Sequence, residues 1–448
     1  MRSIKYHIIV AAFFIIMPAV LNSQEVMTLS SCMKYAVENA PKAKKQAAEN
    51  CILKEDYLSA IMQFLPSVYG SVGTSSSFGR SIDPETNTYA NYTNFSNSYS
   101  LSASYNIFDG FSTVNNYKIA KNAKALGVIT TQQVEDEICL EVIQAYYNLL
   151  YYSEMSKLAE AQLNEAQRNY KMTKKQQEQG LKSYADVAET EASVAEQEYN
   201  LINMQNKNDN ALAVLKQVMY YPISKTLVID NNIPIQLDAI ITIADVDKFV
   251  ETAKNSLPSI LSAKNDILTA EYNYKTAKWG LLPSLNANAG YSTGYIQAFG
   301  AESARDPFWQ QMKDLQGEYV SLSLRIPIFS QLSQQSTIRK NKQQLRIAEY
   351  EYDDKVKAVE VDIELAVQDM NNAMKSFAQA DKRYDAQNIA YGLNLKRYEQ
   401  GLISAIELQT STNTMLSAAA ERLNAFFQYK IKNKVVQYYQ GIPYIEQN

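Results

Sequence analysis

Histidine is almost absent from this chain of 448 residues, whose only one is His7. Beyond the N-terminal two dozen residues, the sequence therefore excludes histidine triads, histidine general bases and histidine metal sites. Asp, Glu, Ser and Lys are present, but they form no visible nucleophile motif or convergent cluster. We therefore expect neither an enzyme nor a bound cofactor or metal.

Helix breakers are scarce too, with 14 glycines and 11 prolines, which favours long uninterrupted helices. Cysteine is limited to Cys32, Cys51 and Cys139. Cys32 and Cys51 are expected on one helix, about 28 Å apart along its axis, whereas a disulfide needs α-carbons within about 7 Å. We interpret the cysteines as buried thiols.

Long apolar runs are missing after residue 23, so no transmembrane helix is expected. At the N-terminus, Arg2 and Lys5 precede an apolar run from Tyr6 to Leu21, and the small residue Ser23 follows. This pattern predicts a secretory signal peptide over residues 1–23. A membrane anchor is the alternative, but the apolar run is short for a span.

Basic residues are fewer than acidic residues. Without Arg2 and Lys5, 41 of the 43 basic residues remain against 47 acidic ones, a formal charge of −6. This balance argues against nucleic acid as a partner.

The chain carries an internal duplication. Gln179-Gly180-Leu181 recurs as Gln400-Gly401-Leu402, and the same offset of 221 relates Phe108 to Phe329 and Pro222 to Pro443. Upstream the offset is 217, as between Pro41 and Pro258. We interpret residues 24–222 and 245–443 as two structural repeats, with an equatorial connector over 223–244 and a tail over 444–448.

Each copy has the same predicted order of helix, strand pair, very long helix, glycine turn and returning helix. The first copy has a helix over 30–64, strands over 65–78 and 97–108 within the pair 65–108, and a helix hairpin over 112–219 made of helices 112–178 and 184–219. The second copy has a helix over 245–281, strands over 283–295 and 318–329 within the pair 283–329, and a hairpin over 332–439 made of helices 332–399 and 405–439. The loops over 80–95 and 295–317 join the strands of each pair.

A seven-residue repeat runs along the second long helix. The positions are Val356, Ile363, Met370, Phe377, Tyr384, Tyr391 and Tyr398. Small residues such as Ala366 and Ala373 follow three positions later, which is typical of a coiled-coil seam with left-handed supercoiling. We interpret this aromatic stripe as core and not as a ligand site.

The predicted strands alternate strictly between apolar and small polar residues. In 318–329, Val320, Leu322 and Leu324 alternate with Ser321 and Ser323. Such long alternating runs are typical of transmembrane strands. A half-buried strand of a soluble sandwich is the alternative, but these strands are about twice the usual length and no second sheet is predicted.

Four strands are too few to close a barrel, and an open edge in hydrocarbon leaves unsatisfied amides. Two chains would supply eight strands, whose interior is filled by side chains, while three would supply twelve around a lumen. The predicted fold class is therefore mostly α with transmembrane β, with long coiled-coil helices and four strands per subunit that contribute to a barrel shared by several copies; a conduit requires at least three.

The duplication, the segments Tyr105–Gly110 and Arg325–Phe329, and the turns Glu178–Leu181 and Glu399–Leu402 resemble the TolC family of outer-membrane efflux and secretion channels. The resemblance covers essentially the whole mature sequence. It implies a homotrimer in the outer membrane, surrounded by lipid, with a shared twelve-stranded β-barrel. It also implies that the long helices form an α-barrel that reaches through the periplasm. It also implies a periplasmic adaptor (membrane fusion) protein and an inner-membrane transporter as partners, in a tripartite efflux pump or a type I secretion system.

The glycine turns hold the candidate gate. Gly180 and Gly401 are expected as left-handed helix ends, and Asp186 and Glu407 as members of capping boxes that begin the return helices. Capping is the structural alternative to a gating role for both acids. The resemblance places Glu407 at an acidic ring of the periplasmic constriction and Tyr398 in the links that close it.

Two residues depart from the family pattern at this turn: Ile403 stands where a linking arginine is expected, and Thr410 where a second acid is expected. The runner-up function is a periplasmic coiled-coil adaptor or fibre without a pore, which would need no lipid-facing strands. The exported cargo, whether drug, metal, polysaccharide or protein, is not encoded in any motif of this sequence.

Overall fold

The computed structural model describes residues 26–82, 88–231, 243–299 and 306–447. The chain divides into two compact units, one formed within 1–36 and 141–237 and the other within 37–140 and 238–447. The predicted signal peptide, and parts of the predicted connector and strand loops, lie outside the described residues. Among the described helices, none has the length and apolar character of a membrane span.

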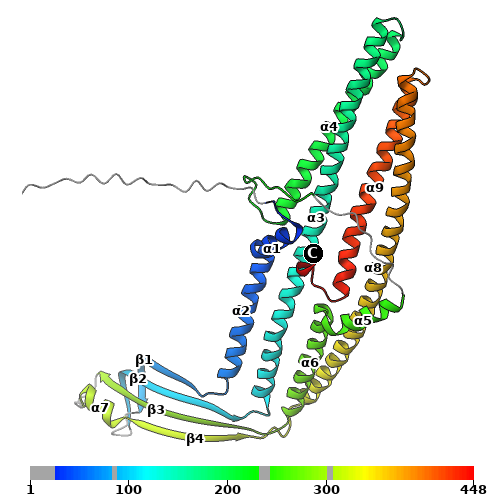
Figure 1. The fold of residues 1–448 in the computed structure, drawn as a ribbon. Helices are drawn as coiled ribbons and strands as arrows, with labels where there is room; N and C mark the ends of the chain where they lie inside the picture. Colours follow the sequence, from blue (N-terminus) through cyan, green and yellow to red (C-terminus); the bar gives the residue numbers. More distant parts are fainter. Residues whose placement is uncertain (1–25, 83–87, 232–242, 300–305, 448) are drawn as a thin grey trace, which may run out of the picture. The chain divides into compact units, whose positions relative to one another are not determined.

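The long helices match the sequence prediction closely (Figure 1). Helix α3 spans Ser112–Glu178 and is followed by α4, Tyr184–Val218. Helix α8 spans Ser333–Glu399 and is followed by α9, Ala405–Tyr439. At 67 residues each, α3 and α8 are about 100 Å long.

The first helix of each repeat is broken, which corrects the prediction of single helices over 30–64 and 245–281. The breaks separate α1, Leu29–Asn39, from α2, Pro41–Met62, and α5, Ile243–Ser256, from α6, Pro258–Trp279. Each second helix begins on a proline, which lacks an N–H and disfavours helical backbone in the residue before it. Ala40 and Leu257 are accordingly extended, with ψ of 128° and 124°.

The cysteine predictions need two corrections. Cys32 lies on α1 and Cys51 on α2, so the two do not share a helix. Cys32 and Cys139 are buried, as expected, but Cys51 is exposed.

The backbone repeats with the same offset as the sequence. Left-handed residues occur in pairs 221 positions apart: Gly110 (φ 67°) with Gln331 (φ 52°), Phe111 (φ 61°) with Leu332 (φ 62°), Gly180 (φ 77°) with Gly401 (φ 74°), and Tyr220 (φ 54°) with Gly441 (φ 91°). The first two pairs precede the long helices, and the others end helices. Several of these residues are not glycine. The two copies therefore share the left-handed backbone even at positions where a β-carbon makes it unfavourable.

Four antiparallel strands form one sheet in the order β1-β2-β3-β4. They are β1, Ser67–Ile82; β2, Tyr89–Phe108; β3, Ser284–Phe299; and β4, Gly317–Arg325. The first pair extends well into the predicted loop 80–95. Strand β4 ends earlier than the predicted 329, because Pro327 cannot donate to a sheet ladder. A short helix, α7, Phe308–Asp314, occupies part of the predicted loop 295–317.

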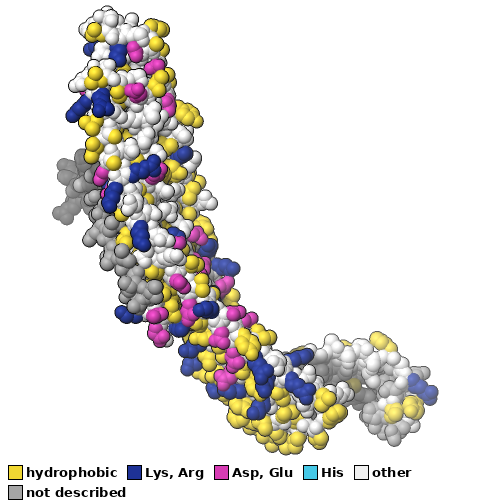
Figure 2. All heavy atoms as spheres, turned by 90° about the vertical axis from the view of Figure 1, so that its right-hand side faces the viewer, with side chains coloured by type: hydrophobic (Ala, Val, Ile, Leu, Met, Phe, Trp, Pro, Cys, Tyr) yellow, Lys and Arg dark blue, Asp and Glu magenta, His cyan; other side chains and the backbone are white. Residues whose placement is uncertain are grey.

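The register gives the sheet one apolar and one polar face. Val68, Ala103, Ala289 and Val320 lie side by side across the four strands, and so share a face. On the opposite face, hydroxyls pair across strands, as in Ser71 with Ser100 (Oγ–Oγ 2.7 Å) and Ser75 with Ser96 (2.8 Å). In the single chain, Val320 is 87% exposed. Figure 2 shows a dense group of hydrophobic side chains near the start of the sheet, while charged side chains are spread over the helices.

The α8–α9 hairpin confirms the coiled-coil seam. Of the seven repeat positions on α8, Val356 and Tyr384 are partly buried and the rest are buried. Met370 packs with Tyr429 and Val436 of α9, and the Phe377 ring contacts Phe426 with a centroid separation of 5.4 Å. Ion pairs flank this seam, including Lys432 Nζ to Asp369 Oδ2 at 2.7 Å.

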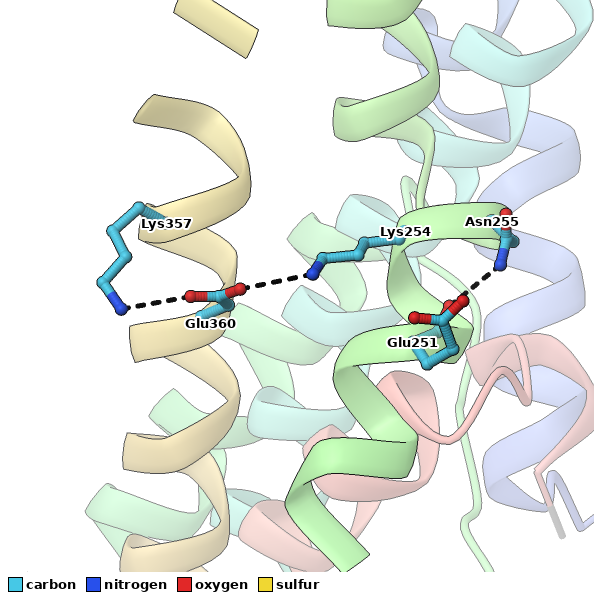
Figure 3. A network of polar contacts seen from close by, with 5 residues as sticks. All are labelled: Glu251, Lys254, Asn255, Lys357 and Glu360. Carbon is cyan, nitrogen blue, oxygen red and sulfur yellow. Dashed lines mark hydrogen bonds and ion pairs between the residues drawn. The ribbon is translucent and has the colours of Figure 1, made fainter. Parts of the chain in front are cut away.

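Helix α5 packs on α8 through an apolar cluster and an ion pair. Ala253 and Leu257 pack with Val359 and Ile363. Beside them, Glu360 lies between two lysines, with Lys254 Nζ at 3.4 Å and Lys357 Nζ at 3.1 Å (Figure 3). Hydrogen bonds from these lysines lower the pKa of Glu360. On α5 itself, the Asn255 amide donates to the carbonyl of Glu251 at 3.1 Å (Figure 3).

In the other unit, part of the predicted connector binds the N-terminal segment. Met27 and Ile229 form a parallel bridge, and the Asp230 N–H donates to the Met27 carbonyl at 3.1 Å. The Tyr146 hydroxyl of α3 donates to the Asp230 carbonyl at 2.8 Å. These bonds hold the described end of the connector along α3.

Candidate functional site at the hairpin turns

The turn between α3 and α4 is a Schellman motif. The Gly180 N–H donates to the Gln177 carbonyl at 2.9 Å, and the Leu181 N–H donates to the Gln176 carbonyl at 2.8 Å. This pair of bonds satisfies carbonyls that would otherwise be free at the helix end. It requires a left-handed residue after the helix, and Gly180 supplies it at φ 77°.

The turn between α8 and α9 repeats this motif 221 residues later. The Gly401 N–H donates to the Tyr398 carbonyl, and the Leu402 N–H to the Arg397 carbonyl, both at 2.9 Å. Gly401 has φ of 74°, so the left-handed helix end predicted at each glycine is confirmed.

Gly401→Ala is expected to destabilise the α8–α9 hairpin by about 1 kcal/mol, because a left-handed backbone clashes with a β-carbon. Gly392→Ala is the matched control, since an added β-carbon meets nothing within 4 Å at either position and Gly392 has no positive φ. At Gly392, alanine should stabilise the helix by a similar amount. Denaturant unfolding of both variants measures the difference, and equal effects would show that φ is not the cause.

Asp186 completes a capping box at the start of α4. Its carboxylate accepts from the Ser183 N–H at 2.9 Å and from the Ser183 hydroxyl at 2.8 Å, while its own N–H donates to Ser183 Oγ at 3.1 Å. These hydrogen bonds from Ser183 hold the pKa of Asp186 below its usual value. The capping interpretation of Asp186 is confirmed.

Glu407 occupies the equivalent place on α9 but forms only half of the predicted box. Its N–H donates to Ser404 Oγ at 3.2 Å. Among the described residues, the Glu407 carboxylate has no hydrogen bond or ion pair, and the side chain is exposed. Glu407 therefore differs from Asp186 in leaving its charge available at the surface of the turn.

Tyr398 lies inside its own hairpin, with 1% of its surface exposed. Its aromatic ring is thus part of the α8–α9 seam and not of the exposed turn. Ile403 is partly buried, and Thr410 is exposed with its hydroxyl donating to the Ile406 carbonyl at 2.9 Å. Of the predicted site residues, Tyr398, Gly401 and Glu407 belong to one turn, and Gly180 and Asp186 to the other.

Both turns expose apolar side chains that the sequence interpretation did not single out. The exposed fractions are 71% for Leu181, 80% for Tyr184, 69% for Leu402 and 62% for Ile406. The signal was present, because Leu181 and Leu402 are the residues that follow the repeated Gln-Gly. Among the described residues, no group of three or more Cys, Asp, Glu or His side chains could hold a metal ion. Each turn therefore presents exposed apolar side chains at its surface.

Comparison with solved structures places this architecture among outer-membrane channels. The CmeC outer-membrane channel of Campylobacter jejuni superposes with a TM-score of 0.74 at 16% identity, covering 93% of this chain and 85% of that one. The fold is therefore that of this class of channels.

The model of the family described as outer membrane efflux protein matches residues 34–219 and 249–437. Outer membrane protein TolC of Escherichia coli (strain K12) is 24% identical over 406 residues, 87% of this chain and 77% of TolC. Alkaline protease secretion protein AprF of Pseudomonas aeruginosa is 20% identical over 306 residues, 68% of this chain and 62% of AprF. This chain belongs to the outer membrane efflux protein family.

The protein is an outer-membrane exit duct that works with efflux or secretion machinery. This agrees with the function predicted from the sequence. The alternative, an adaptor or fibre without a pore, is not favoured.

Proposed function

We propose that three copies of this chain form the duct, with twelve strands closing one barrel in the outer membrane. The supporting observation is the sheet itself, in which β1 and β4 are end strands and each pairs with one neighbour only among the described residues. Lipid does not tolerate such free edges, because unpaired amides there cost several kcal/mol each. Pairing β4 of one copy with β1 of the next removes every edge.

The two faces of the sheet support the same arrangement. The apolar side chains of β4 are 59–87% exposed in the single chain, which suits contact with lipid. The hydroxyl-paired face would line the lumen, as polar residues line the interior of outer-membrane barrels. The helical hairpins then extend into the periplasm as an α-barrel, and residues 24–222 and 245–443 act as two structural repeats of each subunit.

The periplasmic turns are the proposed contact with the rest of the machinery. A periplasmic adaptor protein would meet the exposed Leu181, Tyr184, Leu402 and Ile406, and an inner-membrane transporter would supply the energy. AprF is named for secretion of alkaline protease, and CmeC is described as an outer-membrane channel. Both a tripartite efflux pump and a type I secretion system therefore fit this chain.

Glu407 is the proposed selectivity residue of the constriction at the periplasmic end. In a trimer its three carboxylates would form one acidic ring, and unlike Asp186 this carboxylate is not used by a cap. A ring of carboxylates favours cations and can bind divalent ions. Gly180 and Gly401 would position the turns, and Tyr398 would fix the end of the hairpin from within.

Glu407→Gln is expected to reduce cation selectivity and block by divalent cations, since it removes three charges at a narrow point. The measurement is single-channel recording of the purified oligomer in planar bilayers, after its mass in detergent has been shown to be three times that of the chain. Asp186→Asn is the matched control. It removes the same charge from a carboxylate held in a cap, and should leave selectivity unchanged.

Two results would contradict this proposal. Unchanged selectivity and block in Glu407→Gln would remove Glu407 from the constriction. A monomeric mass together with no conductance would contradict the trimeric duct itself and favour an adaptor-like role.

A further inference from the structure

Helix α7 is attached to the end of β3 that lies beyond β4. The pairing of β3 with β4 stops at Ser292 opposite Gly317, so within the described part of the chain the last part of β3 has no strand on that side. Here the Gln311 side chain of α7 accepts from the Ile296 N–H at 3.0 Å. Gln311 is 8% exposed, and its amide donates to the Asp306 carbonyl at 2.8 Å. Gln311 therefore satisfies a β3 amide where β4 is missing.

The contacts of α7 place it on the apolar face of the sheet. The Thr293 hydroxyl donates to the Met312 carbonyl at 2.7 Å, and the Tyr295 ring contacts Phe308 with a centroid separation of 5.2 Å. Side chains alternate along a strand, so Thr293 and Tyr295 share the face of Ala287 and Ala289. Ala287 and Ala289 lie beside Leu322 and Val320 in the register, which belong to the apolar face.

The position of α7 along this face corresponds to a membrane boundary. From Leu285, near the start of β3, to Tyr295 is ten residues, or about 33 Å along the strand. At a strand tilt near 40° this is about 25 Å along the membrane normal, the height of the apolar band on outer-membrane barrels. Helix α7 thus begins where the band ends.

Two exposed side chains of α7 suit such a boundary. Trp309 is 75% exposed, although its ring contacts Phe308 with a centroid separation of 5.2 Å. Lys313 is exposed four residues later, which places it on the same side of the helix. Tryptophan is enriched at membrane–water interfaces, and a lysine there meets the phosphates of lipid headgroups.

We propose that α7 is an interfacial anchor, lying against the lipid-facing surface at the outer end of the sheet with Trp309 and Lys313 among phosphate-bearing lipid headgroups. In the proposed arrangement the helical hairpins lie in the periplasm, so the opposite end of the sheet, which carries α7, lies at the outer leaflet. The inference rests on the proposed membrane insertion of the sheet, and adds a lipid-binding element that the strands alone do not provide. Because Gln311 accepts a hydrogen bond from a β3 amide, α7 also occupies the edge of β3 at the point where β4 stops.

The chain contains two tryptophans, which allows a direct test. Trp279→Phe leaves Trp309 as the only tryptophan of the full oligomer, which is reconstituted in phosphatidylcholine–phosphatidylglycerol vesicles. The vesicles carry lipids brominated either close to the headgroup or deep in the acyl chain. We expect Trp309 fluorescence to be quenched more by the shallow bromines than by the deep ones.

A second variant separates this inference from the proposed insertion. Val320→Trp, in a background with Trp279→Phe and Trp309→Phe, reports on the middle of the apolar face and should be quenched more by deep bromines. If it is so quenched while Trp309 is quenched by neither lipid, the sheet is inserted and the anchor is wrong. Strongest quenching of Trp309 by deep bromines also overturns the interfacial position. If neither tryptophan is quenched, the proposed insertion fails as well.

Discussion

Val320→Arg is expected to prevent recovery of the assembled channel from the outer membrane, although Val320 is 87% exposed in the single chain. On the lipid face of an outer-membrane barrel, an arginine near the middle of the bilayer costs about 2–4 kcal/mol. In a trimer the change occurs three times, so the total cost is about 6–12 kcal/mol. That is comparable to the whole folding free energy of many proteins. The measurement is the amount of chain recovered as oligomer in purified outer membranes.

Ser321→Arg is the matched control for this prediction. Ser321 is the next residue of β4, also exposed, and lies beside Asn288 on the opposite face. There an arginine would enter the aqueous lumen, so assembly should be kept and ion selectivity should change. Equal recovery of both variants would show that the apolar face does not contact lipid.

The seven-residue repeat explains why the helical part was predictable from the sequence. From Val356 to Tyr398 it fixes one continuous buried stripe, and a stripe of this length allows only a long helix paired with another. The ends were marked by Gly401 and by Ser404, whose preferred conformations stop and start helices. Local chemistry and packing agree at these positions, so the observed bounds of α8 and α9 lie within one residue of the predicted bounds.

Features that depend on contacts distant in the sequence were missed. Helix α7 depends on Gln311 reaching the Ile296 amide and on Phe308 packing against Tyr295. The helix is too short for a hydrophobic periodicity to predict these contacts. The breaks before Pro41 and Pro258 had a local signal, since proline disfavours helical backbone in the residue before it, but the prediction ran one helix through each of them.

In the candidate site, too, some features could be predicted from the local sequence and others could not. The left-handed glycines and the Ser183 cap followed from residue preferences. The difference in hydrogen bonding between the Asp186 and Glu407 carboxylates did not follow from residue preferences. It depends on which side-chain rotamer places the carboxylate against the serine N–H. Tyr398 was predicted as a seam residue by its repeat, and its burial agrees with that prediction; its place in a gate stays a proposal.

The C-terminal segment is attached to the buried carboxyl of Asp136, which leads to a second large expected effect. Asp136 Oδ1 accepts from the Tyr444 N–H at 3.4 Å, and Oδ2 is buried without a partner among the described residues. The Tyr444 ring stacks on Tyr438 with centroids 4.7 Å apart. Asp136 itself is 5% exposed. Burial raises the pKa of Asp136 to about 6, with the Tyr444 N–H and Tyr438 opposing the shift and Glu135 adding to it.

Asp136 should therefore make the protein less stable as the pH rises from about 4 to about 6. In that range the folded state keeps the proton that the unfolded state, with its ordinary pKa of 3.8, has released. The free energy of unfolding consequently falls with increasing pH, and above pH 6 the burial penalty is fully present. Two pKa units correspond to about 3 kcal/mol per chain.

Asp136→Asn is expected to stabilise the protein by about 2–3 kcal/mol per chain at pH 7.5 and by little at pH 4. Asparagine carries no charge, and its carbonyl can still accept from the Tyr444 N–H, so at low pH it resembles the protonated aspartate. The measurement is the free energy of unfolding in detergent at both pH values. Glu137→Gln is the control, because it removes a neighbouring but exposed carboxylate and should produce no such pH-dependent gain. A gain that is equal at both pH values would mean that the pKa of Asp136 is the same in the folded and unfolded protein, so that burial does not raise it.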